Sequence, residues 1–339
     1  MNRRSTAVRF AATLSILIYA AACSDQPTTP VEPAVPDTPS FSAQGVEKFE
    51  VLSHAVIHRT VEAQARAIQA ASHRPGGGSK LLSYHGGTGG IGVETAPRVY
   101  VVFWGSQWSS DPSGEAALVQ SFLNKVGGSS WLNSVTQYCQ GVASGSVSCS
   151  GGTFAGNPAN LLIGVWYDNA SAAPSRPTQS QLAAEAVRAA GHFNNTTASS
   201  NASAQYVIAT AHGNNSSGFG TQYCAYHSYS SSTYGNVAYT NLPYMTDAGA
   251  SCGANFNGLG PNAGITIVEG HELAETMTDQ FPSSGWLDSG GAENADKCAW
   301  ISSGQGATTS ITLGGAQYAV QSLWSNAFNN GAGGCVQSY

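Results

Sequence analysis

Apolar runs of two kinds alternate along this chain, and this alternation limits the possible fold more than any other feature. Short runs rich in β-branched and aromatic residues are typical of strands, and longer runs with helical spacing of apolar residues are typical of helices. Strands are predicted at residues 99–104, 161–166, 206–211 and 237–242, and helices at 114–126 and 179–193. Such alternation favours an α/β fold, with helices packed on a mixed sheet.

The C-terminal third continues with a helix over residues 264–279 and short strands at 297–301, 310–313 and 318–323, joined by Gly- and Asn-rich turns. No second Pro- or Ser-rich break divides the chain after residue 79. Residues 79–339 are therefore interpreted as a single layered α/β domain.

The chain has seven cysteines, an odd number, and Cys23 stands apart from the others near the N-terminus. The other six could form three disulfides that stabilise the loops of an exported domain. Pairing in sequence order is the simplest hypothesis, although the sequence alone cannot choose among the connectivities. The pairs would be Cys139 with Cys149, Cys224 with Cys252, and Cys298 with Cys335.

The N-terminus has the pattern of a signal peptide, since arginines precede an apolar run that ends at Ala22 and is too short to span a bilayer stably. We expect residues 1–22 to be removed. The sequence Ala20-Ala21-Ala22-Cys23 resembles a bacterial lipobox, in which the cysteine becomes lipidated. A lipobox usually has Leu where this chain has Ala20, so a lipid anchor at Cys23 and plain secretion both remain open.

Residues 23–45 contain five prolines among Thr, Ser and acidic residues, a composition typical of an extended linker. Residues 46–78 form the next segment, in which an amphipathic helix is predicted up to residue 74, before Pro75. This segment could pack on the domain or be a detachable pro-segment. The candidate buried positions of the helix are Val46, Phe49, Val56, Val61, Ala65 and Ile68.

Charged residues make up 9% of the chain, against roughly 25% in an average soluble domain. The net charge of -6, with 13 Lys and Arg, gives no basic surface for nucleic acid. After the signal, the sequence contains no apolar stretch long enough to predict a transmembrane helix. We therefore expect an exported protein. It is either held in the cell envelope, where it contacts the membrane through its lipid alone, or secreted.

The segment with the clearest chemistry is the predicted helix 264–279, which contains the pattern His271-Glu272-x-x-Glu275. At about 100° per residue these three side chains and Asp279 fall within one arc of the helix. Apolar residues surround them, so the helix is expected to be buried. Buried carboxylates need partners, protons or a metal, and a divalent cation is the simplest partner.

The related pattern His-Glu-x-x-His binds zinc in metalloproteases, where the two His are ligands and the Glu is the general base. Here Glu275 replaces the second His, which makes the site more anionic and brings Ca²⁺ or Mn²⁺ into competition with Zn²⁺. His271 and Glu275 are the predicted ligands and Glu272 the predicted base. A third ligand is expected from Asp296 or Glu293.

Seven of the 19 acidic residues lie between Glu269 and Asp296, a concentration that indicates a cation site in a charge-poor chain. The alternative is that these acids cap turns and accept hydrogen bonds from backbone amides. His85, in a Gly-rich turn, could supply a ligand from outside the helix.

Several motifs together resemble the phosphate-induced protein family, also called EXORDIUM-like. They cover residues 81–300 in patches. The resemblance implies an extracellular protein with a metalloprotease-like helix, in a family whose substrate is undefined. The matching motifs are Tyr84-His85-Gly86-Gly87, 99–105 with Trp108, 206–211 with Cys224 and His227, His271 to Asp279, Gly285 to Asp288, and Glu293 to Trp300.

These observations predict an extracellular metal-dependent hydrolase, a zinc peptidase acting on proteins or peptides. The alternative is a noncatalytic cell-envelope protein that holds structural Ca²⁺ and binds glycans or proteins. Tryptophans could line a sugar-binding cleft in the second case, although they could equally belong to the core. The candidates are Trp104, Trp108, Trp166, Trp286 and Trp324.

Overall fold

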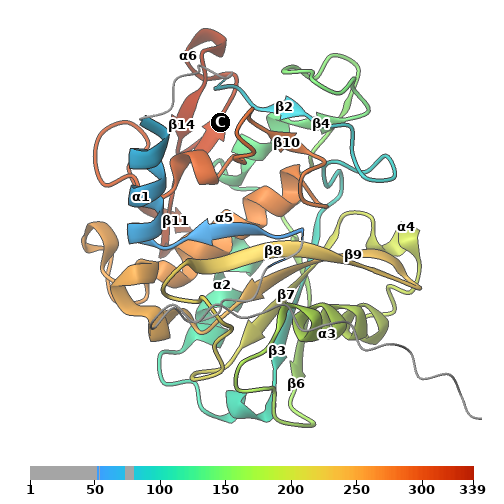
Figure 1. Ribbon diagram of the computed structural model, residues 1–339, viewed down its shortest axis with the longest axis vertical. Coiled ribbons are helices and arrows are strands. Elements are labelled where there is room, and N and C mark those ends of the chain that lie inside the picture. The colour runs from blue at the N-terminus through green and yellow to red at the C-terminus, as the bar shows by residue number, and fades with distance from the viewer. Residues whose placement is uncertain (1–51, 53, 73–79) are drawn as a thin grey trace, which may run out of the picture. The chain divides into compact units, whose positions relative to one another are not determined.

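The domain is built on a six-stranded mixed sheet (Figure 1). The structure is a computed structural model, and it describes residues 52, 54–72 and 80–339. The strand order is β1-β8-β9-β7-β3-β6. Strands β9, β7, β3 and β6 run parallel, while β8 pairs antiparallel with β9 and β1 antiparallel with β8. The strands are β1 Val56–Arg59, β3 Arg98–Trp104, β6 Leu162–Asp168, β7 Ala204–Thr210, β8 Tyr223–Ser232 and β9 Gly235–Leu242.

Strand β3 shows how the layers are built, because its side chains alternate between two cores. Val99, Val101 and Phe103 join the core with α2 (Glu115–Val126) and α5 (Ala263–Thr278). Its alternate residues join the core under α3 (Gln179–His192). The predicted α/β class, with helices packed on a mixed sheet, is therefore confirmed.

The four strands and two helices predicted between residues 99 and 242 are confirmed, with small shifts of their ends. The sequence prediction missed β8, whose residues Tyr, Ser, Cys and His give no simple apolar alternation. Helix α3 begins at a capping box. The Gln181 backbone N–H donates to the Thr178 side chain, and the Thr178 backbone N–H donates to the Gln181 side chain.

Helix α5 passes through the middle of the domain, and all of its 16 residues are buried. It packs against β8, α2 and β12 (Ala316–Val320). Its second residue must be small, because a Cβ on Gly264 would lie 1.9 Å from the Cys252 carbonyl oxygen. The predicted buried helix over residues 264–279 is confirmed.

The predicted helix over residues 46–74 is wrong in its central part. Residues 56–59 form β1, and α1 begins at Val61 and ends at Ser72. Pairing with the open edge of β8 outweighed the local helical periodicity. Two of the predicted buried positions, Ala65 and Ile68, are exposed, and Ile68 retains 59% of its accessible surface.

The predicted signal peptide, Cys23, the linker over residues 23–45, and Val46 and Phe49 lie outside the described residues. The compact unit that contains the described chain is Lys48–Tyr339. No helix among the described residues is long and apolar enough to cross a membrane.

The C-terminal third consists of short hairpins around α5. The predicted strand at 310–313 is confirmed as β11, and the prediction for 318–323 divides into β12 and β13. The strand predicted at 297–301 is wrong, because Asp296–Cys298 forms a 3-10 helix followed by a turn. The remaining elements are β2 Ser83–Tyr84, β4 Cys139–Gln140, β5 Thr153–Phe154, β10 Trp286–Leu287, β11 Thr309–Leu313, β13 Leu323–Ser325, β14 Gly334–Val336, α4 Ala198–Asn201 and α6 Phe328–Gly331, with 3-10 helices at Ser106–Ser109, Leu132–Gln137, Met245–Cys252 and Phe256–Gly258.

Three disulfides join the cysteines in sequence order, as predicted. They link Cys139 with Cys149, Cys224 with Cys252, and Cys298 with Cys335. The second bridge ties the start of β8 to the 3-10 helix Met245–Cys252, and the third ties the Asp296–Cys298 turn to β14. Three bridges are in keeping with an oxidising compartment outside the cytoplasm.

Candidate metal centre

His271 and Glu275 lie one turn apart on α5 and face each other, as their spacing predicts. His271 Nε2 is 3.0 Å from Glu275 Oε1. The other ring nitrogen, Nδ1, lies 3.1 Å from Gln321 Oε1, and Gln321 is itself held by a hydrogen bond from its Nε2 to the Ala295 carbonyl. An imidazole fixed through one nitrogen in this way presents the other nitrogen in a defined direction, as metal-binding histidines do.

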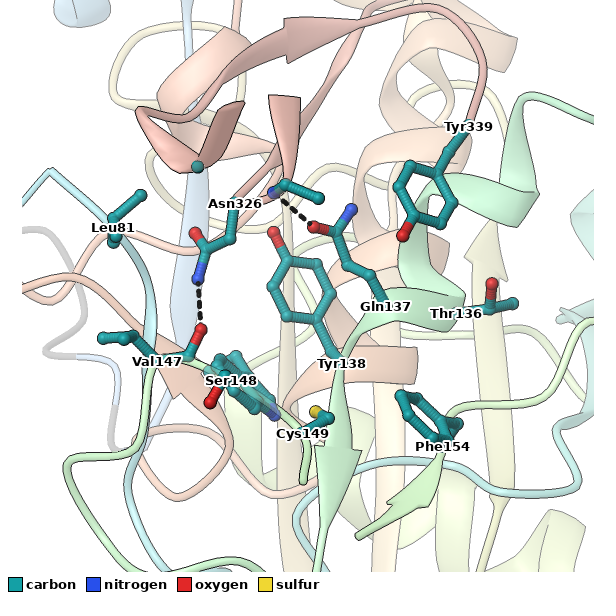
Figure 2. Close-up of a pocket in the computed structure, with 13 residues that line it drawn as sticks. Leu81, Thr136, Gln137, Tyr138, Val147, Ser148, Cys149, Phe154, Asn326 and Tyr339 are labelled. Atoms are coloured by element: carbon teal, nitrogen blue, oxygen red, sulfur yellow. Dashed lines mark hydrogen bonds between the residues drawn. The ribbon is translucent and has the colours of Figure 1, made fainter. Parts of the chain in front are cut away.

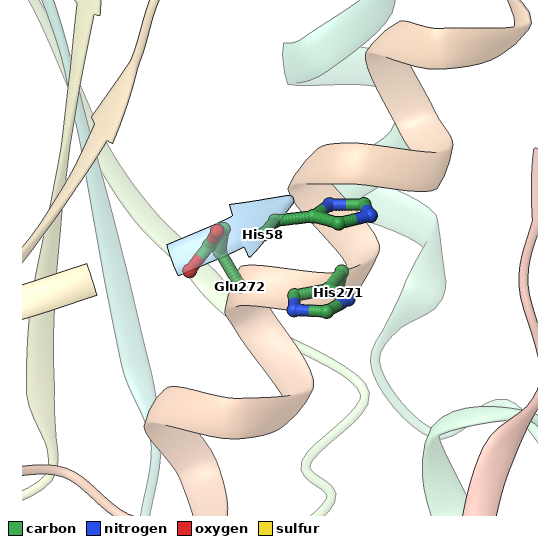
Figure 3. A group of neighbouring side chains, drawn as sticks. All are labelled: His58, His271 and Glu272. Carbon is green, nitrogen blue, oxygen red and sulfur yellow. The ribbon is translucent and has the colours of Figure 1, made fainter. Parts of the chain in front are cut away.

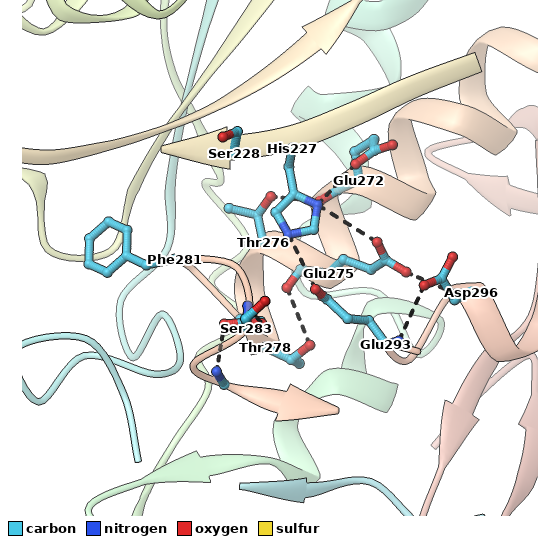
Figure 4. A network of polar contacts seen from close by, with 12 residues as sticks. His227, Ser228, Glu272, Glu275, Thr276, Thr278, Phe281, Ser283, Glu293 and Asp296 are labelled. Atoms are coloured by element: carbon cyan, nitrogen blue, oxygen red, sulfur yellow. Dashed lines mark hydrogen bonds and ion pairs between the residues drawn. The ribbon is translucent and has the colours of Figure 1, made fainter. Parts of the chain in front are cut away.

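Asp296 completes a three-residue group with these two side chains. Its Oδ1 lies 4.0 Å from His271 Nε2, and its backbone N–H donates to Glu275 Oε1 at 2.8 Å. One ligand atom from each of His271, Glu275 and Asp296 lies within 4.8 Å of the others. The structure thus brings together three of the residues that the sequence predicted as ligands, and Figure 4 shows two of them, Glu275 and Asp296.

His227 enters the cluster from β8, which the sequence prediction had missed. Its Nδ1 is 3.1 Å from Glu272 Oε2 and 3.7 Å from Glu275 Oε2, and its Nε2 is 3.6 Å from Glu293 Oε1. A second possible ligand group is therefore His227, Glu272 and Glu275. Glu293 faces His227 and belongs to none of the three-ligand groups among the described residues.

His58 enters from β1, inside the segment that was predicted to be helical. Its ring stacks on that of His271 with centroids 3.8 Å apart (Figure 3), and the Trp300 ring stacks on it at 4.8 Å. The His58 backbone favours the charged form of the Glu272 carboxylate, an effect smaller than that of burial, which raises the Glu272 pKa. His58, His271 and Glu272 form a third group with ligand spacing.

The sequence gives only a weak signal that His227 and His58 belong to the site. In β1, His58 faces α5, while its neighbour Ile57 packs against the core of the other layer. That is the alternation of a strand, but a run of four residues is too short for its period to be distinguished from a helix.

The centre is buried and leaves polar atoms without partners. His58, His227, His271, Glu272, Glu275 and Glu293 are all fully buried, and Asp296 retains 7% of its surface. Within the described part of the chain, both ring nitrogens of His58, Glu272 Oε1 and Glu275 Oε2 have no hydrogen-bond partner. Buried polar atoms are rarely left in this state, because each costs about 1–3 kcal/mol.

Burial also changes the proton affinity of the acids. It raises the pKa of Glu272 and of Glu293 well above the usual value, and the nearby carboxylates, first among them Glu275 for Glu272 and Asp279 for Glu293, raise it further. The pKa of Asp296 is raised to about 7, by burial and then by Glu275. Burial thus favours the protonated form of these carboxyls, whereas a cation bound among them would favour the charged form.

The histidines divide into two kinds. Burial lowers the pKa of His227 to about 4 and that of His58 well below its usual value, so both rings are neutral and suited to metal binding. Burial is the largest single effect on His271 and opposes its charged form, but Glu275, Asp296 and Gln321 together raise its pKa. At Glu275 burial is again the largest single effect, but His271, His227 and the Asp296 backbone together lower its pKa.

Two other acids of the cluster, Asp279 and Asp288, accept hydrogen bonds from backbone amides in turns, as the alternative interpretation of the cluster expected. Asp279 accepts hydrogen bonds from the backbone N–H groups of Ser283, Ser284 and Gly285 and so holds the turn after α5. Asp288 forms a similar turn and an ion pair with Lys297 at 2.6 Å. His85 is exposed and belongs to none of the ligand groups in the described ranges.

A separate cavity of about 490 Å³ opens between β5 and the C-terminal residues (Figure 2). Tyr138, Phe154 and Tyr339 are among its lining residues, and none of the candidate metal ligands is. Of the tryptophans considered for sugar binding, Trp286 contributes to this cavity but retains only 1% of its surface. Trp104 and Trp108 are buried as well, and Trp166 and Trp324 are partly buried, so these rings serve mainly as core.

Comparison of the chain with protein-family models, with curated proteins and with solved structures finds no match. The resemblance to the EXORDIUM-like family therefore stays a prediction from the motifs.

Proposed function

We propose that this protein is an extracellular metal-dependent hydrolase, with a divalent cation held by His271, Glu275 and Asp296. The observation that carries the proposal is the convergence of these three ligand atoms within 4.8 Å in a buried site with unpartnered polar atoms around it. Carboxylates whose pKa values are raised by burial would gain most from a bound cation, because the cation restores their charged form.

The donor set favours zinc. Zinc accepts imidazole nitrogen and carboxylate oxygen, and a catalytic zinc site has three protein ligands and an open fourth position, whereas Ca²⁺ usually takes six to eight oxygen ligands. Mn²⁺ is the nearest competitor, because it accepts both carboxylate and imidazole donors. Glu293 is better placed to hold His227 through the 3.6 Å contact than to act as the third ligand.

A bound zinc ion would polarise a carbonyl group and lower the pKa of a water molecule. Glu272 would then accept the proton of that water as general base, since it neighbours His271 on α5 and has ligand spacing to His271 in one group and to Glu275 in another. His227 would orient Glu272 through the 3.1 Å contact between Nδ1 and Oε2. Peptide bonds are the proposed substrate, and a protein or peptide the proposed partner.

A noncatalytic role is the second candidate, and one observation favours it. Every candidate ligand except Asp296 is fully buried, so the structure offers a substrate no direct path to the centre through the described residues. A cation at a closed site of this kind would act on stability alone, as structural Ca²⁺ does.

Elemental analysis of the protein purified without chelator tests the proposal. We expect close to one zinc per chain, a melting temperature that falls after treatment with chelator and returns with Zn²⁺, and cleavage of members of a broad peptide library. Protein that carries no metal and melts identically with and without Zn²⁺, Mn²⁺ or Ca²⁺ would falsify it.

We further propose that the protein is exported and anchored by a lipid on Cys23. The odd cysteine count and the small residues before Cys23 support this. Cys23→Ser should move the protein from the membrane fraction to the soluble fraction. A wild-type protein without lipid in its intact mass would rule out the anchor and leave secretion.

A further inference from the structure

Strand β1 covers an edge of the sheet that would otherwise be open. Only β9 flanks β8 on its other side, so the four residues of β1 complete the ladder at this end. The pairing is antiparallel, with Val56 opposite His227 and His58 opposite Ala225. The chain segment that occupies the edge is therefore an extended peptide lying across a candidate metal ligand.

This segment also covers the centre itself. The His58 ring lies on the His271 ring, and His58 belongs with His271 and Glu272 to one group with ligand spacing. A few residues later, Gln64 Nε2 donates to the Asp296 carbonyl at 3.3 Å. The segment His54 to Ser72, here called the N-terminal strap, thus lies against a proposed ligand, the proposed base and the backbone of a second ligand.

The helical part of the strap buries little surface. No residue between Val61 and Ala70 is fully buried, whereas His58 and Thr60, which precede α1, are. The junction of β1 and α1 is fixed by hydrogen bonds from Thr60 N–H to the Gln222 carbonyl and from Trp300 Nε1 to the Arg59 carbonyl. A segment with little buried apolar surface opens at a low free-energy cost.

The two faces of β1 meet different surroundings. His58 faces the centre, whereas Ile57 packs on the core that contains Tyr226 and Tyr239. A peptide in the same position would place alternate side chains in the same two environments. The site would therefore prefer an apolar residue at the position that Ile57 now occupies.

We propose that the edge of β8 is the binding site for an extended peptide substrate, and that β1 is an internal competitor that occupies it until the strap moves aside. The inference rests on the proposed hydrolase function and supplies the opening that the buried centre lacks. Main-chain hydrogen bonds to β8 would give the affinity, as in other cases of strand addition to a sheet edge.

The test loosens the strap in the full-length, zinc-loaded chain. Thr60→Val removes the Thr60 Oγ1 that accepts from Ala63 N–H and donates to the Thr221 carbonyl. Combining it with Trp300→Phe removes the hydrogen bond to Arg59 as well. Thr178→Val is the matched control, because it removes a similar helix cap from α3, which contributes no residue to the centre.

The probe is a fluorescent peptide with the sequence of residues 54–60, and a scrambled peptide of equal composition controls for binding to zinc alone. We expect the double variant to bind the probe at least about tenfold more tightly than wild type and the control variant do, which corresponds to about 1.4 kcal/mol. Backbone amides of β8 should also exchange hydrogen faster in the double variant.

Equal binding of the probe by all variants, or equal binding of the scrambled peptide, would overturn the inference even if zinc and hydrolysis are present. Tighter probe binding in the double variant without any hydrolysis would support the peptide site and count against the hydrolase. Binding and exchange are thus read independently of catalysis.

Discussion

The imidazole rings of His58 and His271 lie parallel, with an angle of 3° between their planes and 3.8 Å between their centroids. One ring belongs to the edge strand β1 and the other to the middle of α5. Burial lowers the pKa of His58, and the charge on His271 lowers it further, so His58 is the neutral member of the pair. The N-terminal strap is consequently part of the environment of the metal centre.

Glu272 and Glu275 should respond differently to the same substitution. Glu272→Gln is expected to keep zinc but to lower the rate of peptide hydrolysis by about 10²–10⁴-fold, because the base is lost. Glu275→Gln should lose zinc, because it removes a ligand. Zinc content, thermal melts and hydrolysis of a peptide library measure the difference. If Glu272→Gln also loses zinc, Glu272 is a ligand and the centre is one of the two groups that contain it, with His227 and Glu275 or with His58 and His271.

His227→Gln tests the ligand group that contains His227 directly. With the cation at His271, Glu275 and Asp296, His227 contacts the ligand Glu275 at 3.7 Å without binding the metal, and its replacement should weaken zinc binding by about 10–100-fold without abolishing it. Titration of the metal-free protein with Zn²⁺ measures this. His192→Gln is the control, because His192 stacks on Trp166 in another layer and should leave zinc binding unchanged. Complete loss of zinc in His227→Gln would place the cation at His227.

Glu94 should make the protein less stable as the pH rises. Burial raises its pKa from 4.5 to about 8 in the folded protein, although the hydrogen bond from Gln205 opposes the shift. Between these values the folded chain holds a proton that the unfolded chain has lost. The stabilisation is therefore complete below about pH 4.5 and is lost as the pH rises through about 8.

Glu94→Gln removes this titration and tests the sign. Relative to the variant, wild type should lose up to about 1.4 kcal/mol of unfolding free energy per pH unit across that range. Denaturant unfolding at several pH values measures the difference between the two proteins. A difference that does not change between pH 5 and 8 would show that Glu94 is already ionised when folded.

Two of the disulfides should have separable effects on the metal centre. Replacing Cys224 and Cys252 by Ser is expected to cost about 2–4 kcal/mol of stability and also to weaken zinc binding, because Cys224 fixes the start of β8 near His227. Replacing Cys139 and Cys149 should cost stability alone, since that bridge ties the loop between β4 and β5. Thermal melts and zinc titration of both double variants give the comparison. Equal zinc affinity in the two would show that β8 is positioned without its disulfide.

The amino-acid sequence determined the elements whose signal is local. Apolar periodicity located β3, β6, β7, β9 and the helices α2, α3 and α5, and the spacing of His271 and Glu275 placed both on one face of α5. The helix fixes this relationship, because residues four apart always lie one turn from each other. The pairing of the six cysteines in sequence order was also correct.

Tertiary structure decided what lies opposite α5. Residues 56–59 became a strand only because β8 offered unpaired backbone groups at its edge, and this pairing brought His58 onto His271. His227 reached Glu272 because β8 packs along α5. Contacts between residues far apart in the chain depend on which surfaces pack together, and local periodicity carries no information about that choice. The sequence therefore determined the helix that carries the predicted ligands, while the packing of β1 and β8 determined which histidines join them.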